Sequence, residues 1–128
     1  MTKVKVLSVG LVPSLIDYSA PGFAAYPGMN AEKVMVGLNH DIASLNGLGY
    51  DAKLCLVDYG ETAEAVLKAA LSETACDCIV IGAGVRLFPE NTPLLEKLIN
   101  IIHRNAPDAA LCFNTRPDDT ADAVRRWV

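Results

Sequence analysis

Aromatic residues, long apolar runs and positive charge are all scarce in this sequence. Only 6% of the 128 residues are aromatic although 52% are hydrophobic, so the core must be mainly aliphatic, as where helices pack on a parallel sheet. No apolar stretch approaches the roughly 18 residues of a bilayer-spanning helix, and we expect no membrane partner. The formal net charge is -4. Nucleic-acid binding needs clustered cations, so we expect no nucleic-acid partner either.

The cysteines indicate a reducing compartment. Three of the four lie in apolar, strand-like runs, where a free thiol acts as a small hydrophobe, although two disulfides are arithmetically possible. We therefore expect a cytoplasmic protein. The apolar run at 6–12 follows two lysines, as in a secretory signal, but Pro13 interrupts it and no cleavage site follows. The cysteines are Cys55, Cys76, Cys78 and Cys112.

Short β-branched runs alternate with longer helical patterns along the chain. This alternation is typical of a parallel sheet with crossover helices, and the length suits one domain over residues 1–128. Strands are expected at residues 4–10, 52–58, 77–82 and 109–114. Helices are expected at residues 31–48, 61–74, 92–104 and 119–127, with Asn30 as the N-cap of the first.

The strand order follows from the run at 77–82. It is apolar at every interior position, so both faces of this strand should be covered and the strand should be central. That favours the order 2-1-3-4 over the Rossmann half order 3-2-1-4, in which the third strand lies at an edge. The sequence therefore predicts a three-layer α/β/α sandwich, flavodoxin-like and broadly Rossmann-like, with a four-stranded parallel sheet. Right-handed crossovers place the first and last helices on one face.

Ligands of such sheets bind at the topological switch point, beyond the carboxyl ends of the strands. Here that point lies between the first and third strands. The segment 10–30 extends over it and is about twice the usual length of a strand-to-helix loop. Its aromatic residues Tyr18, Phe23 and Tyr26 either cover a ligand as a lid or close the top of the core.

We expect a small anionic ligand at this crevice. Two glycines after the third strand allow close approach of the backbone, and Arg86 could hold a carboxylate or phosphate. Alternatively, the glycines only form a turn, Arg86 pairs with Glu90, and Thr115 or Asp118 caps the last helix. The expected ligand-binding residues lie at or after the strand ends: Gly10, Ser14, Gly82, Gly84, Arg86, Asn114, Thr115 and Arg116.

The sequence does not identify a reaction or a cofactor. No nucleophile has a partner base, so catalytic residues remain unknown, with Asp17, Tyr18 and Asp58 as acid or base candidates. Asp58 also resembles the start of a capping box for the second helix. No metal is expected, because neither histidine has neighbours at ligand spacing and no Cys-x-x-Cys pair occurs.

Motifs of familiar α/β families are also missing. Neither the dinucleotide-binding G-x-G-x-x-G after the first strand nor the Walker A sequence is present. A receiver domain would carry a phosphorylatable Asp after the third strand, where this chain has Gly82. The predicted fold by itself assigns no function.

A second hypothesis is an interaction module without catalytic activity. The apolar stripe expected on helix 92–104 is wider than one contact with a sheet requires, and part of it could pack on a second copy to form a homodimer. A third is an enzyme using the same crevice. The stripe consists of Leu94, Leu95, Leu98, Ile99, Ile101 and Ile102.

Overall fold

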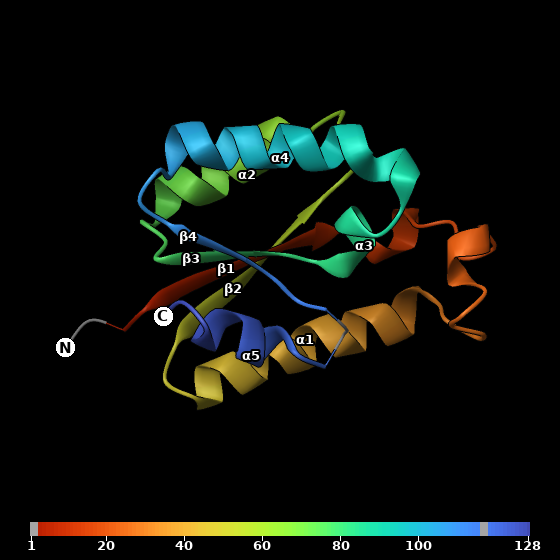
Figure 1. Cartoon of the computed structure of the whole chain (residues 1–128), viewed down its shortest axis with the longest axis horizontal. Coiled ribbons are helices and arrows are strands. Elements are labelled where there is room, and N and C mark those ends of the chain that lie inside the picture. The colour runs from red at the N-terminus through yellow and green to blue at the C-terminus, as the bar shows by residue number, and fades with distance from the viewer. Residues whose placement is uncertain (1–2, 116–117) are drawn as a thin grey trace.

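The computed structural model describes residues 3–115 and 118–128, which form a parallel sheet between two layers of helices (Figure 1). The strand order is β2-β1-β3-β4 and every pairing is parallel, so the predicted fold and order are confirmed. All four residues of β3 are buried, which agrees with the reason for placing this strand in the centre. The strands are β1 (Lys5–Leu11), β2 (Asp51–Val57), β3 (Cys78–Ile81) and β4 (Ala110–Phe113).

The helices lie on the two faces as the right-handed crossover rule predicts (Figure 1). One face carries α1 and α5, and the other carries α2 and α4. Short 3-10 turns lie at Pro13–Leu15, Pro21–Phe23 and Pro89–Asn91. The helices of the described residues are α1 (Ala31–Gly47), α2 (Ala63–Glu73), α3 (Ala83–Arg86), α4 (Thr92–Asn105) and α5 (Thr120–Arg125).

Local side chains explain where two helices begin. Asn30 caps α1 as predicted, because its Oδ1 accepts a hydrogen bond of 2.9 Å from Lys33 N. Helix α2 begins at Ala63 and not at residue 61. The Asp58 carboxylate accepts backbone N–H groups from Gly60, Thr62 and Ala63, which holds the preceding residues in a turn. The sequence did not predict α3, the four-residue helix directly after β3.

Each face of the sheet has its own hydrophobic core. The α2 and α4 face has the larger one, in which Leu67 and Leu98 are fully buried against Val9 and Ile81. The core under α1 and α5 is smaller, and Leu45 is the only residue of α1 that is buried. The amino-terminal half of α1 is therefore not packed tightly on the sheet.

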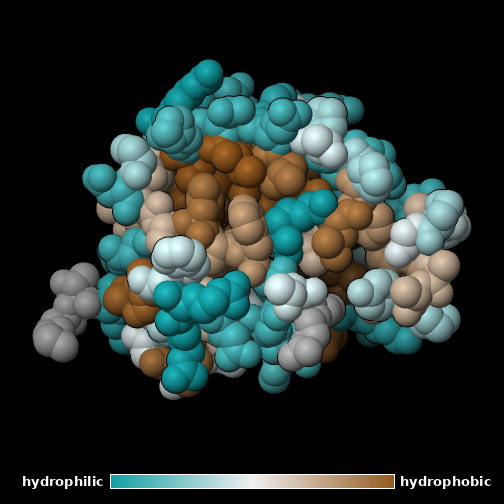
Figure 2. All heavy atoms as spheres, viewed as in Figure 1, coloured by the Kyte–Doolittle hydropathy of each residue, from teal (hydrophilic) through white to brown (hydrophobic). Residues whose placement is uncertain are grey.

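The molecular surface shows where apolar side chains are left uncovered. Figure 2 shows hydrophobic side chains between the layer of α4 and the layer of α1 and α5, over the edge strand β4. Phe113 in this strand is 38% exposed. Within residues 3–115 and 118–128, none of the helices combines the length and apolar character of a membrane-crossing segment.

Candidate functional site

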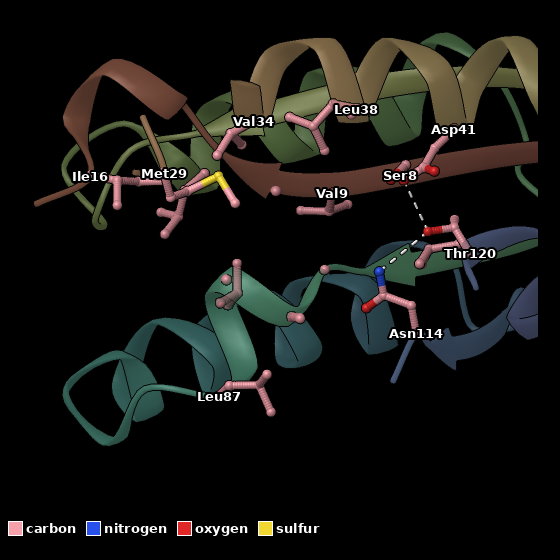
Figure 3. A pocket seen from close by; sticks show the side chains of 18 of the residues that line it. Ser8, Val9, Ile16, Met29, Val34, Leu38, Asp41, Leu87, Asn114 and Thr120 are labelled. Atoms are coloured by element: carbon pink, nitrogen blue, oxygen red, sulfur yellow. Dashed lines mark hydrogen bonds between the residues drawn. The ribbon is translucent and has the colours of Figure 1, made fainter. Parts of the chain in front are cut away.

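A cleft of about 230 Å³ lies between α1 and the carboxyl ends of β1 and β3 (Figure 3). This is where the predicted strand order places the switch point. Residues from α1, the segment 12–30, α3 and the end of β4 complete its walls.

The cleft exists because small residues occupy positions where a packed core needs large ones. Along β1, Leu7, Val9 and Leu11 belong to the larger core, so the alternation of a strand directs Ser8 and Gly10 toward α1. Both line the cleft, as do Gly82 and Gly84 beyond β3.

The α1 wall is apolar but is not in contact with the sheet core. Val34 and Leu38 are partly exposed and line the cleft. Gly37 lies between them, and a Cβ added there would meet nothing within 4 Å. A helix-interior glycine costs about 1 kcal/mol relative to alanine, and Gly37 is an exposed residue at the opening of the cleft.

The segment 12–30 covers the outer end of the cleft. Ile16, Phe23, Tyr26 and Met29 line it. The Phe23 ring lies 5.1 Å from Tyr18 and 5.2 Å from Phe88 between centroids, which joins the segment to the chain that follows α3. Phe23 is only partly buried and Tyr26 is 43% exposed. These aromatic residues border the cleft and are outside both cores.

The inner end of the cleft is polar and holds a directed chain of hydrogen bonds (Figure 3). Arg86 Nη2 donates to Asn114 Oδ1 at 2.8 Å, which leaves the Asn114 amide group as a donor. Asn114 Nδ2 then donates to Thr120 Oγ1 at 3.2 Å, and Thr120 Oγ1 donates to Asp41 Oδ2 at 3.1 Å. The Asp41 carboxylate is thus the final acceptor of the chain.

Two further features set the electrostatics of the polar end. Burial raises the pKa of Asp41, and Asp118 and Asp119 raise it further, whereas the Thr120 hydrogen bond and His40 lower it. The second feature is Ser8, which is only 7% exposed. Its hydroxyl makes no hydrogen bond to residues 3–115 and 118–128, and because every fully buried side-chain polar atom there has a partner, this hydroxyl is accessible from the cleft.

The predicted ligand-binding residues fall into three groups. Ser14 is exposed and lies outside the cleft, and Arg86 is also absent from its lining. Arg116 lies outside the described residues. The residues that do line the cleft are Gly10, Gly82, Gly84, Asn114 and Thr115.

Arg86 joins α3 to the ends of two strands. Its Nε donates to Ile81 O at 2.9 Å, its Nη2 donates to both oxygens of Asn114, and the guanidinium lies 5.1 Å from the Phe113 ring centre. Burial lowers the pKa of Arg86, against the opposing effect of Asp119. These contacts are neither the predicted anion contact nor the alternative pairing with Glu90.

The acid and base candidates have local structural partners and are not in the lining of the cleft. Asp17 accepts hydrogen bonds from the backbone and hydroxyl of Ser19, which lower its pKa. The Tyr18 hydroxyl donates to Pro13 O at 2.8 Å. Hydrogen bonds from the start of α2, with Thr62 first, lower the pKa of Asp58. As described above, Asp58 holds the turn before α2.

The cysteines are free, as predicted. Burial raises the pKa of the Cys55 thiol to about 11. The sulfur atoms of Cys78 and Cys112 lie 3.5 Å apart on neighbouring strands, where they share a hydrogen bond and form no disulfide. Both histidines are exposed. Within the described ranges, no group of three or more His, Cys, Asp or Glu side chains is arranged to hold a metal ion.

At the polar end the sequence predicted Asn114 but not Ser8, Asp41 or Thr120. Asp41 follows Leu38 by three residues and Val34 by seven, so it is an acidic residue on the predicted apolar face of α1. Ser8 is likewise a polar residue within a buried strand. Both signals were present in the sequence. The chain matches no protein-family model and no curated protein.

Proposed function

We propose that this protein binds a small, largely apolar molecule in the cleft at the carboxyl ends of β1 and β3, with the segment 12–30 as its cover. The observation that carries the proposal is the open wall at Gly37. Gly37 is an exposed residue of α1 that lines the cleft, and a Cβ added there would meet no atom within 4 Å. The cleft is therefore open at this wall, and a small molecule can reach the strand ends through it.

The volume limits the size of the ligand. An engineered apolar cavity of about 150 Å³ accommodates benzene. By this comparison, the 230 Å³ of the cleft suits a molecule of roughly ten non-hydrogen atoms. The apolar lining from Leu38, Val34 and Met29 would contact the body of such a molecule.

The charges around the cleft do not favour the anion expected from the sequence. The Nε and Nη2 groups of Arg86 donate to backbone and Asn114 oxygens, and Arg86 does not line the cleft. Lys33 lines the outer end, where its Nζ donates to Gly28 O at 3.0 Å. The carboxylate of Asp41 lies at the inner end.

The apolar stripe of α4 does not favour the interaction module. Four of its residues are buried in the larger core, and Leu95 and Ile99 pack against the same core. Leu98 in particular is 0% exposed. The width of the stripe is thus explained within one chain.

A thermal-shift screen of small metabolites tests the proposal. Ligands of the folded state raise the melting temperature by mass action, and Gly37→Leu should abolish these shifts because its side chain fills the cleft. Gly47→Leu is the matched control, since Gly47 lies in the same helix with equally open space but outside the cleft. Compounds that raise the melting temperature of Gly37→Leu as much as that of the wild type would show that they bind outside this cleft and would refute the proposed site.

A further inference from the structure

We propose that the polar end of the cleft binds a primary ammonium group, so that the ligand is a small amine with an apolar body. This inference rests on the proposed function and specifies its ligand class. It is carried by the direction of the hydrogen bonds at Asp41 and by the free hydroxyl of Ser8.

The chain of hydrogen bonds leaves acceptor atoms, and not donors, available at the polar end of the cleft. Because Arg86 fixes the orientation of the Asn114 amide, the Thr120 hydroxyl hydrogen is directed at Asp41 Oδ2. The Asp41 Oδ1 atom accepts no hydrogen bond from any residue in the described part of the chain. It is therefore available to a donor that enters the cleft.

Ser8 supplies a second acceptor at the same end of the cleft (Figure 3). The residue is 7% exposed, and strand alternation directs its side chain toward α1. Among the described residues no fully buried side-chain polar atom lacks a hydrogen-bond partner, so the unpaired Ser8 Oγ is accessible from the cleft that it lines. An ammonium carries three N–H donors, which can satisfy Ser8 Oγ and Asp41 Oδ1 together.

The surrounding charges also favour a cation. The carboxylates of Asp118 and Asp119 add negative charge near Asp41, and His40 is the basic side chain that interacts with it electrostatically. Lys33, which would hold an anion, lies about two turns of α1 from Asp41. A partly buried carboxylate gains more from a paired cation than an exposed one does, because the local dielectric is lower.

Three probes with the same phenylethyl body separate the possible head groups: 2-phenylethylamine, 2-phenylethanol and 3-phenylpropanoate. Calorimetric titration at pH 7 should give the amine roughly tenfold or higher affinity over the alcohol, as expected for hydrogen bonds to a charged group. The carboxylate should bind most weakly. Asp41→Asn should remove the preference for the amine and leave the affinity for the alcohol within about threefold.

Glu32→Gln is the matched control, because it removes a negative charge from the first turn of α1 at an exposed position. It should keep the preference for the amine. Ser8→Ala is the second variant and should weaken amine binding several-fold more than alcohol binding.

Equal affinities for amine and alcohol, or tightest binding of the carboxylate, would overturn the ammonium site while leaving a binding cleft. A preference for the amine that survives Asp41→Asn would do the same. If none of the probes binds, and no small molecule distinguishes the wild type from Gly37→Leu, the proposed function fails and this inference fails with it.

Discussion

Replacing Gly37 by alanine should stabilise the protein, although the residue lines its cleft. Glycine inside a helix costs about 1 kcal/mol relative to alanine. No strain reduces this gain, because the added Cβ meets nothing within 4 Å. For 128 residues, the unfolding entropy is about 0.27 kcal/mol per degree, so a gain of about 1 kcal/mol raises Tm by about 4 °C.

Urea unfolding and calorimetry of wild type and Gly37→Ala measure this gain. Gly47→Ala is the control in the last turn of α1, where the space is also open and the gain should be equal or smaller. A loss of stability in Gly37→Ala would show that the α1 wall is already in contact with the sheet. The reasoning that derives a ligand site from the open wall would then be refuted.

Three other predictions follow from burial and packing. Asp41→Asn should be more stable than wild type at pH 7, because burial raises the pKa of Asp41 in the folded protein. The free energy of unfolding of the wild type therefore falls as the pH rises through that pKa and the carboxyl ionises, whereas the asparagine stays neutral. A stability difference between the two proteins that widens in acid would contradict this. Leu98→Ala should lower the free energy of unfolding by roughly 2–5 kcal/mol. If the variant kept its stability and sedimentation showed that an oligomer had dissociated, the interaction module would be favoured. Gly22→Ala should displace the cover, since a Cβ there overlaps the Phe88 ring, and limited proteolysis within 12–30 should be faster; unchanged cleavage would argue against this contact.

The sheet was predictable because its signals are local. The uninterrupted apolar run of β3 indicates burial on both faces, and burial on both faces indicates a central strand. Asn30 at the start of α1 is a similar case, since its capping bond reaches only to Lys33. Helix α3 was not predicted because its four residues, which follow Gly82, are too few to show the spacing of apolar residues that indicates a helix.

The candidate site was predictable in position but not in chemistry. Long loops and glycines at strand ends indicate where a crevice lies, yet they do not show which side chains enter it. Arg86 is the clearest case, because its partner Asn114 is 28 residues away in sequence. Only the fold shows that the arginine orients an amide in a network of hydrogen bonds ending at Asp41, and this network is the basis of our proposal that the ligand is a cation.

The most direct test of the binding cleft is a titration of the ¹⁵N-labelled protein with 2-phenylethylamine, followed by amide chemical shifts. The glycine amides form a natural set of probes, because some line the cleft and others do not. We predict shifts at Gly10, Gly37 and Gly82, with Gly47 and Gly60 unchanged. Shifts confined to Gly47 and Gly60, or no shifts at any of them, would contradict the account.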